Sequence, residues 1–147
     1  NIIPGEVTLG GGIRCFDRDT RTLLKSRVVE VVEGVCASLG ATGSVDFGVD
    51  FPALLNGVDE VSMAGDVASS IVGDDNVERD SDPVLGSEDF AFMLEEVPGC
   101  YIFIGNGTGK GGCMIHNPGY DFNDDAAVLG ATYWVRLAQK FLSANSG

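Results

Sequence analysis

The sequence is poor in histidine and in basic residues. His116 is the only histidine, and nine Lys and Arg stand against 22 Asp and Glu, for a net charge of −13. Phosphate backbones and anionic membranes are held through Lys and Arg, so this balance disfavours nucleic acid and membrane surfaces as partners. No stretch approaches the ~20 apolar residues of a membrane span. We therefore expect no nucleic-acid partner, no membrane partner and a cytoplasmic location.

Cysteine patterns typical of disulfide frameworks or structural zinc sites are also missing. Four cysteines occur in 147 residues, and none forms a CxxC pair. Disulfide frameworks are typical of shorter secreted chains with denser cysteines. Cys36 lies on an apolar helical stripe and Cys100 opens an apolar run, so we interpret both as small buried hydrophobes.

Three segments have the pattern of β-strands. Apolar and other residues alternate over 7–15 and over 45–51, which predicts half-buried strands, and residues 101–104 form a continuous apolar run typical of a buried strand. The first two flank a helical segment. This strand–helix–strand order predicts a βαβ unit or half of a ferredoxin-like split-βαβ sheet.

Helical periodicity fills most of the remaining sequence. Apolar residues recur at three- and four-residue steps from Leu24 to Leu39, with Asp17 among the capping candidates and Gly40 as a stop. Similar patterns predict helices over 61–71, ending at Gly73, and over 87–97, with Ser87 as N-cap, and a last helix after Asn123 or Asp124. The composition changes near residues 54–57, where we place a domain boundary.

The long segment between the last predicted strand and the last helix holds the candidate chemistry. A loop of about 19 residues, 105–123, is unusual in a compact domain and is most often functional or disordered. His116 within it has four interpretations: a general base oriented by Asp121 or Asp124, half of a zinc knuckle with Cys113, a metal ligand of another kind, or a surface residue. The segment "GNGTGKGG" (105–112) lacks the spacing and the following Ser or Thr of a phosphate-binding loop.

Four segments in order carry a family resemblance. They are "NIIPGEVTLGGGIRCFD" (1–17), "GSEDFAFML" (86–94), "FIGNG" (103–107) and "IHNPGYDFNDDAAVLGA" (115–131). Together they resemble the second half of the zinc-dependent aminoacylase and carboxypeptidase family, in the branch of N-acyl-amino-acid amidohydrolases that includes hippurate hydrolase. The resemblance covers nearly the whole chain.

The resemblance implies an α/β protein of two parts. Residues 1–54 would be the second half of a ferredoxin-like lid, which in the family also forms the homodimer contact. Residues 55–147 would be the C-terminal portion of an α/β metallopeptidase-like catalytic domain. The first half of the lid, the other metal ligands and the general-base Glu would then precede Asn1, so the chain alone is expected to be inactive.

The resemblance also assigns site residues. His116 matches the family's last metal ligand, for Zn or Mn, and is the only ligand in this chain. Asn1 and Arg14 match lid residues that reach the substrate carboxylate, for which Arg offers a planar two-donor fork. Glu88 lies in a motif lining the catalytic cleft. The implied activity is metal-dependent hydrolysis of the amide bond of N-acyl amino acids; the alternatives are a non-catalytic dimerisation or interaction module and a degenerate truncated homologue.

Overall fold

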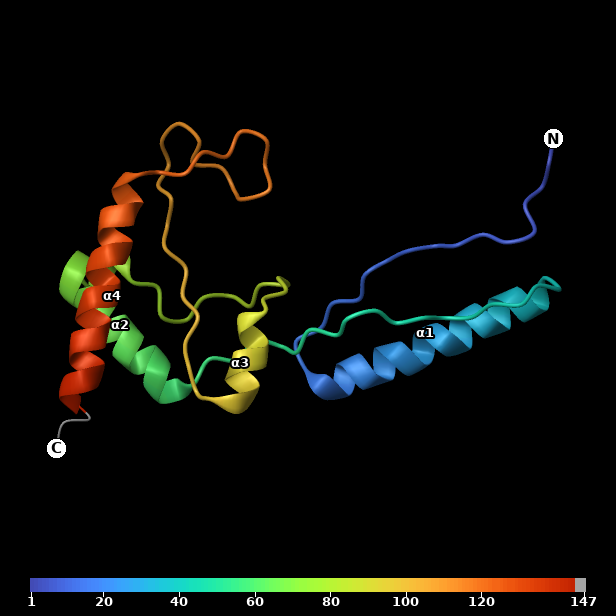
Figure 1. Cartoon of the computed structure of the whole chain (residues 1–147), viewed down its shortest axis with the longest axis horizontal. Coiled ribbons are helices and arrows are strands. Elements are labelled where there is room, and N and C mark those ends of the chain that lie inside the picture. Colours follow the sequence, from blue (N-terminus) through green and yellow to red (C-terminus); the bar gives the residue numbers. More distant parts are fainter. Residues whose placement is uncertain (145–147) are drawn as a thin grey trace. The chain divides into compact units, whose positions relative to one another are not determined.

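The computed structural model describes residues 1–144, and in this part of the chain the regular structure is helical (Figure 1). The elements are α1 (Arg18–Ser38), α2 (Val58–Val72), the short 3₁₀ helix η1 (Asp74–Asn76), α3 (Phe90–Glu96) and α4 (Asp125–Ala144). The chain divides into two compact units. Unit 1 is Asn1–Leu54 with Pro83–Met93, and unit 2 is Leu55–Asp82 with Leu94–Gly147.

Helix α1 begins and ends at the residues that the sequence indicates. The Asp17 carboxylate accepts a hydrogen bond from the Thr20 amide at 2.7 Å, which satisfies a donor of the first turn and lowers the pKa of Asp17. At the other end Gly40 has a φ of 73°. The Gly40 amide donates to Ala37 and the Ala41 amide to Cys36, which is the Schellman pattern of helix termination.

The segment after α1 returns along the same helix within unit 1 (Figure 1). Lys25 donates to Asp50 at 3.1 Å and places its ammonium 4.7 Å from the centre of the Phe47 ring. Gly43 lies so close to α1 that a Cβ there would be 2.7 Å from the Cys36 sulfur. These contacts hold residues 43–50 against one face of α1.

The core of unit 2 forms between α2 and α4. Ala64 and Val67 of α2 and Tyr133 of α4 are each at most 4% exposed. The partly buried residues that pack against them include Cys100 and Ile102. Burial raises the pKa of the Tyr133 hydroxyl and of the Cys100 thiol, because the charged forms lose hydration.

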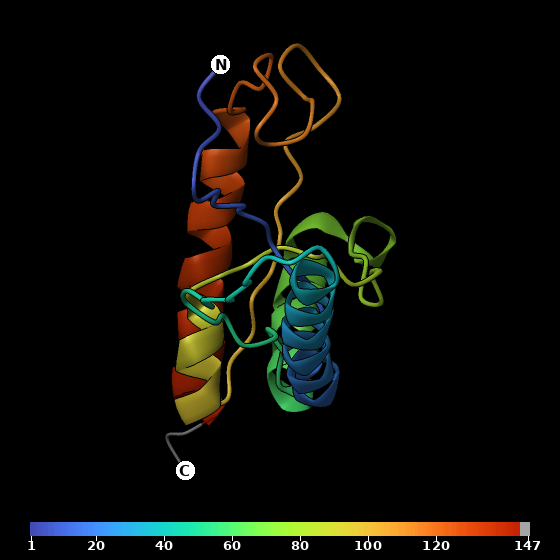
Figure 2. The ribbon, with the colours of Figure 1, turned by 90° about the vertical axis from the view of Figure 1, so that its right-hand side faces the viewer.

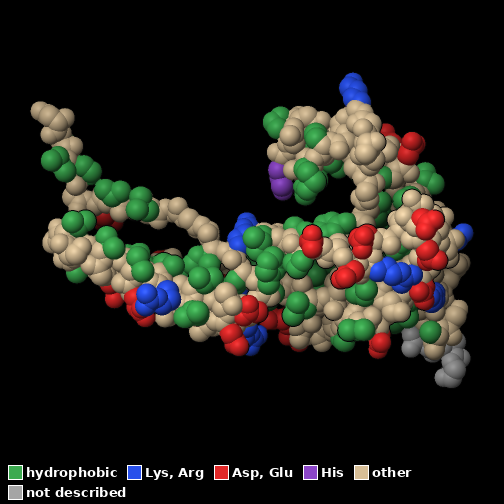
Figure 3. All heavy atoms as spheres, turned by 180° about the vertical axis from the view of Figure 1, so that it is seen from behind, with side chains coloured by type: hydrophobic (Ala, Val, Ile, Leu, Met, Phe, Trp, Pro, Cys, Tyr) green, Lys and Arg blue, Asp and Glu red, His purple; other side chains and the backbone are tan. Residues whose placement is uncertain are grey.

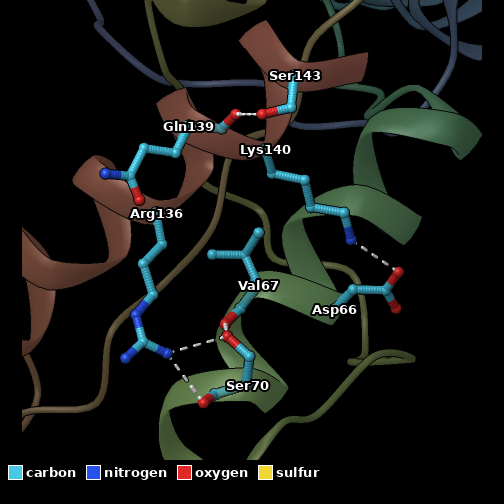
Figure 4. A pocket seen from close by; sticks show the side chains of 7 residues that line it. All are labelled: Asp66, Val67, Ser70, Arg136, Gln139, Lys140 and Ser143. Carbon is cyan, nitrogen blue, oxygen red and sulfur yellow. Dashed lines mark hydrogen bonds and ion pairs between the residues drawn. The ribbon is translucent and has the colours of Figure 1, made fainter.

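Polar contacts join α2 and α4 at the surface beside this core (Figure 4). Arg136 donates to the Ser70 carbonyl at 3.1 Å, and Lys140 donates to the Asp66 carboxylate at 3.0 Å. Lys140, followed by Arg79, lowers the pKa of Asp66. Asn56 exchanges two hydrogen bonds with the Tyr101 backbone, so the extended segment around Tyr101 is fixed within the same unit.

The predicted α/β fold is wrong for the part of the chain that is described. Residues 7–15, 45–51 and 101–104 are without regular structure, and no strand or sheet occurs between residues 1 and 144. A strand exists only when a second strand completes its backbone hydrogen bonds, whereas a helix completes them within its own segment. The alternating pattern of these segments therefore does not by itself produce a sheet, and neither the βαβ unit nor the ferredoxin-like half-lid forms.

The first segment of unit 1 ends at Leu54 and unit 2 begins at Leu55, close to the predicted domain boundary. Unit 1, however, also contains Pro83–Met93. The assignment of residues 1–54 to a lid and of 55–147 to a catalytic domain stays a prediction. None of the helices in residues 1–144 combines the length and the apolar character that crossing a bilayer requires.

Candidate functional site

The loop that carries His116 is closed at its base by two asparagines. The Asn123 amide donates to the side-chain oxygen of Asn106 at 2.8 Å, and the Asn106 side chain donates to the Asp121 carbonyl at 2.8 Å. The Asn123 side chain in turn accepts from the Asp125 amide, at the first residue of α4. Figure 2 shows the loop (orange) at the N-terminal end of α4. The base of the loop is thus anchored to the helix.

Within the loop, the backbone of Gly111 is in contact with Asp121. The Asp121 amide donates to the Gly111 carbonyl at 3.1 Å. Gly111 has a φ of 80°, and a Cβ there would lie 2.4 Å from the Asp121 Cβ. Both observations require glycine. Residues 112–120 therefore form a closed loop within the larger one, and His116 lies in it.

His116 has an unusual backbone conformation. Its φ of 67° makes it the one residue other than glycine with a positive φ among residues 1–144. An L-residue in the left-handed region costs roughly 1–2 kcal/mol relative to ordinary conformations. Such strain persists only where the surroundings enforce it, and it concentrates at functional sites. Two hydrogen-bonded turns enforce this conformation. In the first the Asn117 amide donates to the Met114 carbonyl at 3.3 Å, and in the second the Tyr120 amide donates to the Asn117 carbonyl at 2.9 Å.

The His116 side chain is exposed, as the space-filling view shows in purple (Figure 3). Within residues 1–144 it has no hydrogen-bond or ion-pair partner. The general-base interpretation with Asp121 or Asp124 lacks the orienting hydrogen bond that it needs. The half-buried Cys113 thiol is directed at the Gly111 carbonyl, 3.9 Å away, and within residues 1–144 no contact joins it to His116.

An exposed imidazole with no hydrogen-bond partner suits one coordination position of a divalent metal ion. A complete centre needs more: catalytic zinc takes about three protein ligands. No group of three or more His, Cys, Asp or Glu side chains able to hold a metal occurs among residues 1–144. The described residues therefore fit a metal ion as one ligand and do not form a metal centre by themselves.

Arg14 is fixed within unit 1 by two long-range hydrogen bonds. Its Nη1 donates to the Leu85 carbonyl and to the Ser87 hydroxyl, each at 2.9 Å. Asn1 is exposed, and no hydrogen bond joins it to Arg14 in the described chain. The structure thus connects Arg14 to the "GSEDF" motif, although it does not pair the two residues expected to share the substrate carboxylate.

Glu88 follows Ser87 directly and is half-buried. Its carbonyl accepts from the Ala91 amide at 3.2 Å, and α3 begins two residues later at Phe90. Ser87 was expected to cap this helix, but its hydroxyl accepts from Arg14 instead. Sequence reasoning missed this contact because a Ser before an apolar helical run is the usual cap signal. Unit 1 thus holds Asn1, Arg14 and Glu88, and unit 2 holds His116.

A shallow polar pocket of about 390 Å³ lies between α2 and α4 of unit 2 (Figure 4). Its lining side chains bond mostly to one another, as in the Lys140–Asp66 pair and the Arg136–Ser70 bond. None of the residues singled out from the sequence lines it. The pocket therefore belongs to the packing of the two helices rather than to the candidate site.

Known proteins resemble the chain over almost all its length. Hippurate hydrolase of Campylobacter jejuni is 30% identical over 142 residues, which is 97% of this chain and 36% of that protein. Thermostable carboxypeptidase 1 of Saccharolobus solfataricus is 34% identical over 144 residues, or 96% of this chain and 36% of that protein. N-acetylcysteine deacetylase of Bacillus subtilis is 27% identical over 139 residues, or 94% and 35%.

The chain thus spans about a third of the length of these relatives. No solved structure matches it. The model of peptidase family M20/M25/M40 matches residues 6–140, a range that contains Arg14, Glu88 and His116. Peptidases of this family are in general metal-dependent hydrolases, which agrees with a loop that presents one exposed imidazole. The resemblance stated from the four sequence segments is confirmed, and the chain belongs to peptidase family M20/M25/M40.

Proposed function

We propose that this chain is one part of a metal-dependent amidohydrolase that cleaves the amide bond of N-acyl amino acids. The names of two relatives support the substrate class, since hippurate is an N-acyl amino acid and N-acetylcysteine is another. The chain covers about a third of those proteins, so the proposed activity is that of a longer protein to which these residues would contribute.

The observation that carries the proposal is the conformation of His116. A closed loop forces a positive φ on this residue and leaves its imidazole exposed. The strain has no structural benefit within the loop, because glycine would occupy the position at lower cost. We attribute the histidine at this position to the chemistry of its imidazole, as one ligand of a Zn or Mn ion. The ion supplies Lewis-acid polarisation of the scissile carbonyl.

The other predicted residues would act on the substrate. Arg14 and Asn1 would bind the carboxylate of the amino-acid part, Arg14 through its planar fork and Asn1 through its amide. Glu88, two residues before α3, would orient groups along the cleft. These roles follow from the matches of residues to the family motifs.

We also propose that the longer protein is a homodimer in which residues 1–54 take part. Helix α1 has no buried residue, and its Leu23, Val31 and Val35 are each more than half exposed. An apolar face of this kind is covered in most stable proteins. The expected cytoplasmic location stays a prediction, which cell fractionation would test.

The alternative is a non-catalytic interaction module. It is favoured by one observation, the exposed apolar side chains Leu23, Val31 and Val35 of helix α1. The two functions differ in what His116 contributes, so an experiment on this residue separates them.

The test measures hydrolysis of N-benzoylglycine by the full-length protein that contains this chain. His116→Asn keeps a residue that tolerates a positive φ and removes the imidazole. We expect kcat to fall by at least a hundredfold, because the change removes a ligand of the catalytic ion. Thr108→Ala, an exposed position in the same loop, is the matched control. Unchanged turnover in His116→Asn, or no turnover in the unmodified protein, would reject the amidohydrolase proposal.

A further inference from the structure

The two hydrogen bonds of Arg14 occupy one side of its guanidinium. Both acceptors, the Leu85 carbonyl and the Ser87 hydroxyl, bind Nη1, which has two hydrogens to donate. The bonds join positions 71 and 73 residues apart in the sequence, both within unit 1. A long, exposed arginine side chain is otherwise free to adopt many rotamers, so these bonds fix where its charge lies.

The opposite edge of the same group remains available. Nε and Nη2 lie side by side in the planar guanidinium and point their hydrogens in the same direction, which is the geometry that a carboxylate accepts with its two oxygens. Neither nitrogen has a hydrogen-bond or ion-pair partner among residues 1–144. Arg14 is therefore bound through one edge and open through the edge that recognises carboxylates.

We propose that Ser87, together with the Leu85 carbonyl, is a positioning residue that aims the Nε–Nη2 edge of Arg14 at the substrate carboxylate. This inference rests on the proposed function, in which Arg14 binds that carboxylate. Ser87 acts only through Arg14 and touches neither substrate nor metal. The Ser87 hydroxyl accepts the arginine hydrogen, and its own hydrogen is free for a further acceptor.

The position of Ser87 in the chain gives this contact a second consequence. Glu88 is the next residue, so the group that holds Arg14 and the carboxylate expected in the cleft are joined by one peptide bond. The hydroxyl does not cap α3, which begins at Phe90. Its removal should therefore leave that helix intact and change mainly where Arg14 lies.

A test on the full-length protein compares Ser87→Ala with Ser87→Thr, which retains the hydroxyl. The control is Ser81→Ala, an exposed serine outside the contact. The substrates are N-benzoylglycine and N-benzoylglycinamide, which share the scissile bond and differ in the carboxylate. A hydrogen bond of this kind contributes roughly 0.5–1.5 kcal/mol, so KM for the acid should rise about twofold to tenfold in Ser87→Ala. KM for the amide substrate should be unchanged in Ser87→Ala, and KM for the acid substrate in Ser87→Thr should equal that of the unmodified protein. Equal losses on both substrates would overturn the positioning role.

A second measurement does not depend on turnover and separates the two proposals. Millimolar N-benzoylglycine is titrated into the 147-residue chain while the Arg14 Nε–H resonance is followed by NMR. The proposal expects a shift in the unmodified chain that is lost in Ser87→Ala and retained in Ser87→Thr. Equal shifts of the Arg14 resonance in Ser87→Ala and Ser87→Thr, or no shift in the unmodified chain, would overturn the proposal. If the full-length protein hydrolyses neither substrate, the proposed function fails and this titration alone decides the role of Ser87.

Discussion

Replacing Gly111 by alanine should open the loop that holds His116. Two effects add. At a φ of 80° an alanine pays roughly 1–2 kcal/mol for the left-handed conformation. Its Cβ would also lie 2.4 Å from the Asp121 Cβ and 3.0 Å from the Asp121 nitrogen, so the backbone of one of the two residues must move. The hydrogen bond from the Asp121 amide to the Gly111 carbonyl, 3.1 Å long, is the contact that this movement breaks.

The assay is hydrogen exchange of the Asp121 amide, which reports opening of the loop rather than global unfolding. A cost of 1–2 kcal/mol corresponds to an increase of about fivefold to thirtyfold in the exchange rate, and the steric clash raises it further. Gly109→Ala is the matched control, because a Cβ at Gly109 meets nothing within 4 Å and its φ is not positive. Equal exchange in the two variants, or an unchanged rate in Gly111→Ala, would refute the reasoning that the Gly111–Asp121 contact closes the loop.

Three further predictions concern the core and the activity. Val67→Ala should lower the free energy of unfolding by roughly 2 kcal/mol in urea titrations, since Val67 is 3% exposed, while Val58→Ala in the same helix, at 84% exposed, should change it little. Burial raises the pKa of the Cys100 thiol and of the Tyr133 hydroxyl above their ordinary values of 9.0 and 10.0. Their contribution to stability is therefore complete below about pH 9 and is lost as the pH rises, so circular dichroism should show alkaline unfolding that Tyr133→Phe weakens. The 147-residue chain alone should hydrolyse no N-acyl amino acid, because His116 supplies one ligand; turnover in a colorimetric amine-release assay would contradict this.

The helices were predictable because their signals are local. Asp17 caps α1, Gly40 ends it and Gly73 ends α2, as the sequence indicates. Each of these signals acts within a few residues of the backbone groups that it satisfies or the turn that it permits. The end of the loop at the start of α4 was likewise visible from the sequence, whereas its predicted start at residue 105 was wrong, because irregular structure already begins after α3 at residue 97.

The sheet was not predictable in the same way. Residues 45–51 form a strand only if a second strand, distant in the sequence, completes their backbone hydrogen bonds. The alternating pattern indicates that the side chains are compatible with a sheet, but it does not provide that second strand. In the structure this segment packs on α1 instead, through Asp50 and Phe47. The error came from treating a pattern that permits pairing as one that ensures it.

The candidate site was predictable in part. His116 could be selected as the sole histidine within a family motif, but nothing in the sequence indicates its positive φ, which arises from the turns at Met114–Asn117 and Asn117–Tyr120. The contact between Arg14 and Ser87 joins residues 73 positions apart, so no local pattern reports it. Long-range hydrogen bonds of exposed side chains are set by tertiary packing, and only a structure reveals them.

The central claim is that His116 is a metal ligand of an M20-family amidohydrolase. The most direct measurement is the metal content of the full-length protein, unmodified and with His116→Asn, by mass spectrometry after removal of loosely bound ions. Thr108→Ala, an exposed position in the same loop, controls for metal lost during purification and for the effect of any substitution in the loop. We predict that the unmodified protein and the control contain the same number of Zn or Mn ions per subunit, and that His116→Asn contains at least one fewer. Identical metal content in all three proteins would contradict the claim.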